Sequence, residues 1–297
     1  MTAEQDSNLD INQGPQEYVA PTTLGQAAEA VADGNATILA GGTDLMLQTA
    51  VGHINYRTRL VNIRRVAELR GVSKQDDEIR IGAATTITDI RNDELLSRMA
   101  PVLVEAANHF AGSQIRNAAT IGGNICNASP AGDTLPALLI LDAEVELTCS
   151  SAGTLAQRRM PLTGFFTGPG QTAMLANELL SAIVFRIPEH RAEATFIKSG
   201  PRPALEISIV SAAISAIRDT NVLFHVRLAF GAVAPVPLRA TATEAFIEGK
   251  TLDDDLIEQA VDILMSEINP IDDVRATAWY RRHLAAVYLR RLLVDEY

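Results

Sequence analysis

The segment TIGGNICNASPAGD, residues 120–133, places two adjacent glycines among threonine, asparagine, serine and aspartate side chains. It is too polar and too rich in glycine to belong to a hydrophobic core. Glycine allows another group to come close to the backbone, and neutral donors and acceptors suit the hydroxyls and phosphate oxygens of a nucleotide. The segment therefore predicts a ligand held against the main chain at Gly122 and Gly123.

A second pair of glycines lies in LAGGTDLM, residues 39–46, between an apolar strand and a helix. The free amides of a first helical turn favour an anion, and pyrophosphate would suit them. Taken alone, this loop is better explained by a tight turn without ligand, because neither common phosphate-binding glycine motif is present. Together with segment 120–133, it favours a shared ligand site. A carboxylate repels phosphate, so we expect Asp44 to point outward and complement the helix N-terminus.

Two residues of the first segment have open roles. Asp133 either accepts hydrogen bonds from a ligand or caps a helix expected for TLPALL, and both roles can hold at once. Cys126 is expected to be a small buried packing residue, since no second cysteine lies near it in the sequence. No spacing typical of a Ser-His-Asp, Cys-His or zinc site is present, so we predict neither catalytic residues nor metal ligands in this chain.

Composition narrows the functional class. The 297 residues carry a formal charge of −11, which argues against binding nucleic acid or anionic lipid. The acidic N-terminus has no apolar signal region, and no apolar run is long enough to span a bilayer. Two cysteines, Cys126 and Cys149, are too few for a disulfide framework or an iron–sulfur cluster. We therefore expect a cytoplasmic protein with reduced thiols.

Hydrophobic periodicity and turn residues predict the organisation of the chain. Residues 1–15 are expected to form a disordered tail. The segment 16–190 should form one domain, including one helix at 97–110; its division into subdomains at about 16–70 and 71–190 is implied only by the family resemblance given below. Beyond it, 191–297 should form an α+β domain in which helices at about 252–268 and 276–294 pack beside three antiparallel strands.

Five motifs, in this order along the chain, resemble one known family. They are ILAGGTDL, IRNAATIGGNICNASPAGDTLPALLILDAEVEL, FFTGPGQT, KSGPRPALEISIVSAA and GAVAPVPLRA. The chain resembles, over roughly residues 16–297, the flavin-binding medium subunit of the molybdenum hydroxylases, which include xanthine dehydrogenase and carbon monoxide dehydrogenase. The resemblance implies an α+β fold, with a two-subdomain FAD-binding fold of the vanillyl-alcohol-oxidase / p-cresol-methylhydroxylase type followed by a C-terminal domain with a three-stranded antiparallel sheet.

The resemblance also implies a set of cofactor-binding residues. Both glycine loops would hold the FAD pyrophosphate, Asp133 would lie near the ribityl chain, an apolar residue near the rings, and a lysine close to the isoalloxazine. The residues in these positions are Ala40, Gly41, Gly42, Thr43, Asp44, Thr120, Ile121, Gly122, Gly123, Asn124, Asp133, Leu179 or Leu180, and Lys198. A cationic Lys198 would stabilise an anionic reduced flavin, and an exposed strand lysine is the alternative. No histidine or cysteine matches the covalent flavin attachments of the wider fold, so FAD should be bound non-covalently.

By the same resemblance, the remaining redox centres lie on partner chains. A large subunit would carry molybdopterin and a small subunit the [2Fe–2S] clusters, with electrons leaving FAD for NAD, a quinone or oxygen. A free-standing flavoenzyme that oxidises a small molecule itself is the alternative, and a nucleotide-binding module without a redox role is a third. In the last helix, Arg281, Arg282, Arg290 and Arg291 are expected to form a solvated basic face, with contact to a partner subunit as the other possibility.

Overall fold

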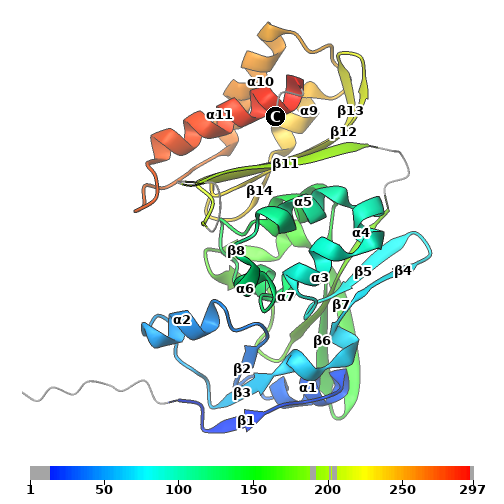
Figure 1. Cartoon of the computed structure of the whole chain (residues 1–297), viewed down its shortest axis with the longest axis vertical. Helices are drawn as coiled ribbons and strands as arrows, with labels where there is room; N and C mark the ends of the chain where they lie inside the picture. The colour runs from blue at the N-terminus through cyan, green and yellow to red at the C-terminus, as the bar shows by residue number, and fades with distance from the viewer. Residues whose placement is uncertain (1–13, 188–191, 201, 203–205, 295–297) are drawn as a thin grey trace, which may run out of the picture.

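The computed structural model describes residues 14–187, 192–200, 202 and 206–294. The tail predicted for residues 1–15 lies outside this range except for its last two residues. The described chain is α+β, as predicted. It forms three parts stacked along the long axis of the molecule, each built on its own sheet (Figure 1). Within the described residues, no helix combines the length and the apolarity needed to cross a membrane.

The first part contains a small parallel sheet in the order β1-β3-β2, formed by β1 (Glu17–Val19), β3 (Arg59–Asn62) and β2 (Ala36–Leu39). Helix α1 (Leu24–Val31) begins where the Thr23 side chain accepts a hydrogen bond from the amide of Gln26. Strand β2 leads through Gly41 and Gly42 into α2 (Leu45–Ala50). The predicted order of strand, glycine pair and helix is therefore correct.

The middle part contains a five-stranded antiparallel sheet. Its order is β4 (Val72–Gln75), β5 (Glu78–Gly82), β10 (Leu179–Arg186), β6 (Glu144–Ser151) and β7 (Thr154–Pro161). The helices of this part are α3 (Ile87–Asn92), α4 (Glu94–Met99), α5 (Pro101–His109), α6 (Ser113–Arg116), α7 (Ile121–Cys126) and α8 (Thr134–Ile140). A short pair, β8 (Phe166–Gly168) and β9 (Gln171–Thr172), follows β7.

The single helix predicted at 97–110 is wrong. Helix α4 ends at Met99, and α5 begins at Pro101, with Ala100 between them. Proline has no amide donor and favours the first turn of a helix, so it starts a new helix here.

The last part contains four antiparallel strands rather than the predicted three. They are β11 (Glu193–Ser199), β12 (Val210–Asp219), β13 (Val222–Gly231) and β14 (Leu238–Arg239). Strand β14 is only two residues long and follows the sequence PVP, so no periodicity reveals it. Helices α9 (Thr241–Ile247), α10 (Asp254–Glu267) and α11 (Ala278–Val294) cover one face of this sheet (Figure 1).

The other face of this sheet packs on α5 and α8 of the middle part. Phe196, Ala213 and Ala229 lie side by side across three strands and join the core of the middle part. Their neighbours Ala212 and Phe230 point the opposite way, into the core with α9–α11. Because successive strand residues face opposite sides and both sides are buried, the first eight residues of β12, VSAAISAI, contain no charged side chain.

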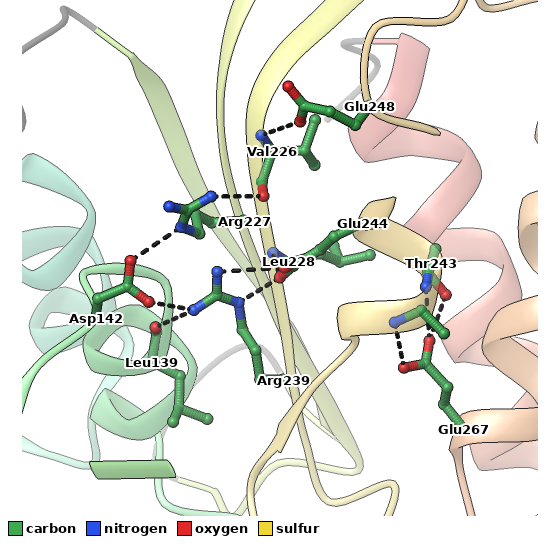
Figure 2. Close-up of polar contacts among 11 residues, drawn as sticks. Leu139, Asp142, Val226, Arg227, Leu228, Arg239, Thr243, Glu244, Glu248 and Glu267 are labelled. Carbon is green, nitrogen blue, oxygen red and sulfur yellow. Dashed lines mark hydrogen bonds and ion pairs between the residues drawn. The ribbon is translucent and has the colours of Figure 1, made fainter. Parts of the chain in front are cut away.

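A polar network adds to this contact near the end of α8. Arg239 of β14 donates hydrogen bonds to the Leu139 carbonyl and the Asp142 carboxylate, and it pairs with Glu244 (Figure 2). Arg227 of β13 pairs with the same Asp142 at 2.9 Å. The sheet of the last part is thus held to the middle part by ion pairs as well as by a shared core.

The solvated basic face expected for α11 is wrong for Arg281 and Arg282, which are bonded to backbone carbonyls of their own domain, whereas the Arg290 side chain is 40% exposed. Arg281 is 3% exposed, and it donates to the carbonyls of Ile209 and Ala232 and to Asp273. Arg282 donates to two carbonyls at the end of α10, and Arg290 pairs with Glu258 of that helix. These side chains fasten α11 to its own domain.

Arg281→Met should lower the free energy of unfolding by about 3 kcal/mol, because it leaves two carbonyls and a carboxylate without their partner. Arg290→Met is the control, and it should cost less than about 1 kcal/mol because its pair is exposed. Urea denaturation near neutral pH measures both. Equal losses in the two variants would contradict the structural role of Arg281.

The contribution of this network should also depend on pH. Burial by itself would raise the pKa of Asp273, but amide hydrogen bonds from Arg275 and Ala276 and the Arg281 guanidinium lower it to about 2. A carboxyl whose pKa is lower in the folded protein stabilises the fold above its unfolded pKa. The difference between wild type and Arg281→Met should therefore shrink as the pH falls from about 4 toward about 2.

Candidate functional site

A groove of about 680 Å³ runs across the three parts of the molecule. It brings together nine of the residues singled out from the sequence. They are Ala40, Gly41, Gly42, Thr43, Asp44, Thr120, Gly123, Asn124 and Asp133. Two segments far apart in the chain, one around Gly41 and one around Gly123, thus form one site.

The glycine loop at residues 40–44, the first along the chain, lies against the backbone at Ala118, which precedes the second glycine loop at residues 120–124. A Cβ atom at Gly41 would overlap the carbonyl of Ala118, so only glycine fits there. Gly42 has a φ of +74°, a conformation that glycine adopts without strain. Within the described residues, the amides from Gly41 to Asp44 donate no hydrogen bond, so they are available to an anion in the groove.

The second glycine loop uses its amides inside the protein. Ile121 donates to the Thr85 carbonyl, Gly122 to the Ala83 carbonyl, and Gly123 to the Thr120 hydroxyl. A Cβ at Gly122 would lie 2.7 Å from the Ala83 oxygen. Glycine is therefore required at 122 by packing against Ala83 rather than by a ligand. Neither Ile121 nor Gly122 lines the groove.

Thr120, Gly123 and Asn124 of the second loop line the groove, and among them Asn124 has a side-chain donor to offer a ligand. Asn124 accepts a hydrogen bond from the Thr134 hydroxyl through its Oδ1 at 2.7 Å. Its amide nitrogen has no acceptor within the described chain, so it can donate to a ligand. A Cβ at Gly123 would meet only the Thr120 hydroxyl, at 2.9 Å.

Asp133 forms a buried pair with Lys198. The Lys198 ammonium lies 2.7 Å from one carboxylate oxygen of Asp133, and the Ser208 hydroxyl donates to the other at 2.6 Å. Burial raises the pKa of Asp133, although Lys198 opposes the shift. The side chain makes no capping hydrogen bond to α8, and the Lys198 side chain is only 7% exposed. The helix-cap alternative for Asp133 and the exposed-lysine alternative for Lys198 are therefore wrong.

The two leucines are buried outside the groove. Leu179 and Leu180 on β10 are 1% and 3% exposed, and they belong to two different hydrophobic cores. Large apolar side chains that do line the groove include Ile38, Leu45 and Phe110, together with the more exposed Ile54, Ile115 and Ile207, which are 38%, 40% and 49% exposed. Sequence reasoning missed them because an isolated apolar residue carries no signal that distinguishes a groove wall from a core.

Comparison with known proteins identifies the family. Residues 11–189 match the model of the FAD binding domain in molybdopterin dehydrogenase, and residues 195–295 match the CO dehydrogenase flavoprotein C-terminal domain. The chain belongs to the molybdopterin dehydrogenase flavoprotein family. The resemblance found in the sequence is thereby confirmed.

Individual relatives are similar to this flavoprotein in sequence or structure over nearly its whole length. A putative xanthine dehydrogenase FAD-binding subunit of Escherichia coli (strain K12) is 36% identical over 282 residues, covering 94% of each chain. The carbon monoxide dehydrogenase medium chain of Hydrogenophaga pseudoflava is 30% identical over 281 residues, covering 93% of this chain and 95% of that one. A solved structure of carbon monoxide dehydrogenase from the same organism superposes with a TM-score of 0.87 at 28% identity, over 93% of this chain and 95% of that one.

The groove of this flavoprotein fits the cofactor that its family name implies. Its volume lies within the range of small-molecule and cofactor sites. Unused amides suit a pyrophosphate, and exposed isoleucines suit the face of a planar ring. Asp44 occupies the cap position of α2 without a capping hydrogen bond, and its carboxylate accepts instead from the Gln48 side chain at 2.8 Å.

Cys126 also lines the groove. Burial raises the pKa of its thiol to about 12, so the thiol stays protonated at neutral pH. A protonated thiol is a poor nucleophile, which agrees with the packing role expected from the sequence.

Gly122→Ala should lower the free energy of unfolding by about 1–3 kcal/mol, because the added methyl group would force the loop away from Ala83. Gly25→Ala in α1 is the matched control, since a Cβ there would meet nothing within 4 Å. It should leave stability unchanged or raise it by less than about 1 kcal/mol. Thermal unfolding of both variants measures the difference, and a neutral Gly122→Ala would contradict the packing explanation.

Proposed function

We propose that this chain is the FAD-binding electron-transfer subunit of a molybdenum-containing hydroxylase or dehydrogenase. It is an oxidoreductase subunit that takes electrons from an iron–sulfur partner through FAD to an external acceptor. The observation that carries the proposal is the groove at the two glycine loops, with a run of unused amides, in a chain of this family. FAD supplies the redox chemistry, and the protein supplies binding, orientation and electrostatics.

The first glycine loop is the main pyrophosphate site in this proposal. The amides from Gly41 to Asp44 donate to phosphate oxygens, and Asn124 adds its side-chain amide from the second loop. Gly123 lets the cofactor approach the backbone beside them, and Asp133 faces the ribityl region. The remaining predicted residues act indirectly: Ile121 and Gly122 hold the loop in place, Leu179 and Leu180 pack β10, and Lys198 pairs with Asp133.

We propose a division of the chain into an FAD-binding domain at 16–190, with subdomains at about 16–70 and 71–190, and a C-terminal domain at 191–297. Three hydrophobic cores support this division. One lies largely under the first sheet, one under the five-stranded sheet, and one between the last sheet and α9–α11. The core of the middle part also includes Phe196, Ala213 and Ala229, so the C-terminal domain is docked rather than freely tethered.

Two kinds of partner subunit follow from the names of the relatives. Medium chains and FAD subunits imply accompanying chains, and we propose a large molybdopterin-binding subunit and a small iron–sulfur subunit. The electron acceptor would be NAD, a quinone or oxygen, and the complex would work in the cytoplasm.

Purified protein should contain one non-covalent FAD per chain, which acid precipitation releases as FAD into the supernatant. Gly123→Val should abolish this binding, because its side chain would occupy the space next to the Thr120 hydroxyl and the pyrophosphate. Cys126→Ser is the control and should retain the flavin. Colour that stays in the protein pellet would refute non-covalent binding, and FMN in place of FAD would refute the pyrophosphate site.

The isolated chain should be reduced by dithionite but not by an N-heterocycle or an aldehyde. Stopped-flow mixing with candidate substrates measures this directly through bleaching of the flavin absorbance. Activity should appear only after reconstitution with the molybdenum and iron–sulfur partners. Rapid bleaching by an organic substrate in the absence of partners would replace the subunit proposal with a free-standing flavoenzyme.

A further inference from the structure

The ammonium group of Lys198 is fully occupied within the protein. Its three hydrogens match three acceptors: a carboxylate oxygen of Asp133 at 2.7 Å, the Glu206 carbonyl at 2.9 Å and the His109 carbonyl at 3.2 Å. Lys198 is also absent from the groove lining. It therefore has no free donor to offer a cofactor, and a direct contact with the isoalloxazine would require breaking one of these bonds.

These bonds join four separate segments. His109 ends α5, Asp133 directly precedes α8, Lys198 lies on β11, and Glu206 begins the stretch that leads into β12. Ser208 joins the same cluster, because its hydroxyl donates a hydrogen bond to the second carboxylate oxygen of Asp133. Two segments of the middle part are thus tied to two segments of the C-terminal part at a single buried point.

The segment fixed in this way is also a wall of the groove. Glu206 and Ile207 are the groove-lining residues that come from the C-terminal part, and Ile207 is 49% exposed there. The Lys198 bond to the Glu206 carbonyl and the Ser208 bond to Asp133 hold this wall on both sides of Ile207. The shape of the groove therefore depends on this buried pair.

We propose that Lys198 is a positioning residue that holds segment 206–208 of the C-terminal domain as a wall against the flavin, acting through Asp133 and the Glu206 carbonyl. The inference rests on the proposed FAD site and adds to it a coupling between domain docking and cofactor binding. In some proteins a buried ion pair specifies one arrangement rather than adding net stability, and the Asp133–Lys198 pair, with its hydrogen bonds satisfied, can act in this way.

The test compares three variants of the full chain with wild type. Lys198→Met removes all three donors while keeping a long side chain, and Ser208→Ala removes one bond of the same cluster. Arg227→Met is the matched control, because Arg227 also links the two parts by an ion pair, with Asp142, but does not line the groove. For each protein, flavin fluorescence gives the Kd of the apoprotein for FAD, and visible circular dichroism reports the surroundings of the bound ring.

Lys198→Met should raise the Kd at least about tenfold and change the visible circular dichroism, whereas Arg227→Met should alter the Kd less than about twofold. Ser208→Ala should weaken binding about threefold with a smaller spectral change, and it decides the question if Lys198→Met does not fold. Wild-type Kd and spectrum in folded Lys198→Met or in Ser208→Ala would overturn the proposal, as would an equal loss in Arg227→Met. A wild-type apoprotein that binds no FAD would instead overturn the proposed function.

Discussion

The close approach of the two glycine loops is the constraint on which the site depends. The backbone at Gly41 touches the carbonyl of Ala118, and the backbone at Gly122 lies against Ala83. Side chains at either position would push apart segments that are distant in the sequence but adjacent in the fold. Both contacts leave no room for a side chain, so the two loops lie close enough to form one groove.

Helix α8 connects this site to the C-terminal domain. Carboxylates flank this helix. Asp133 before it pairs with Lys198 of the last sheet, and Asp142 after it pairs with Arg227 and Arg239, as Figure 2 shows. Between them the helix packs on strands β12, β13 and β14. The two ends differ, however, because the Asp133 pair is buried and the Asp142 side chain is 59% exposed. Only the buried end lies at the groove, so we expect geometry there to be held most strictly.

Much of this arrangement follows from local sequence signals. Glycine pairs mark both loops, and the apolar strand, glycine pair and helix at residues 36–50 follow in the predicted order. Local sequence signals do not predict a contact whose partner lies far away in the chain. Nothing near Gly122 in the sequence points to Ala83, and nothing near Lys198 points to the His109 carbonyl. A two-residue strand such as β14 is likewise set by its neighbour β13 rather than by its own sequence.

The charges around the groove show how an acidic protein can hold a diphosphate. Among the described residues that line it, none is a lysine, arginine or histidine, while Asp44, Asp133 and Glu206 are acidic. Each carboxylate accepts a hydrogen bond from the protein: Asp44 from Gln48, Asp133 from Lys198 and Ser208, and Glu206 from the amide of Arg202. One oxygen of Asp44 and of Glu206 is thus directed into the protein, and the charge of Asp133 is balanced by Lys198.

Attraction must then come from neutral dipoles, and in the proposed site the unused amides of the first loop would supply them. Fixed backbone dipoles bind an anion without the reorganisation that flexible lysine side chains require. The absence of a cation from the described lining also leaves the charge of the flavin itself uncompensated by direct contact. The buried, neutralised Asp133–Lys198 pair therefore shapes this end of the groove through geometry more than through net charge.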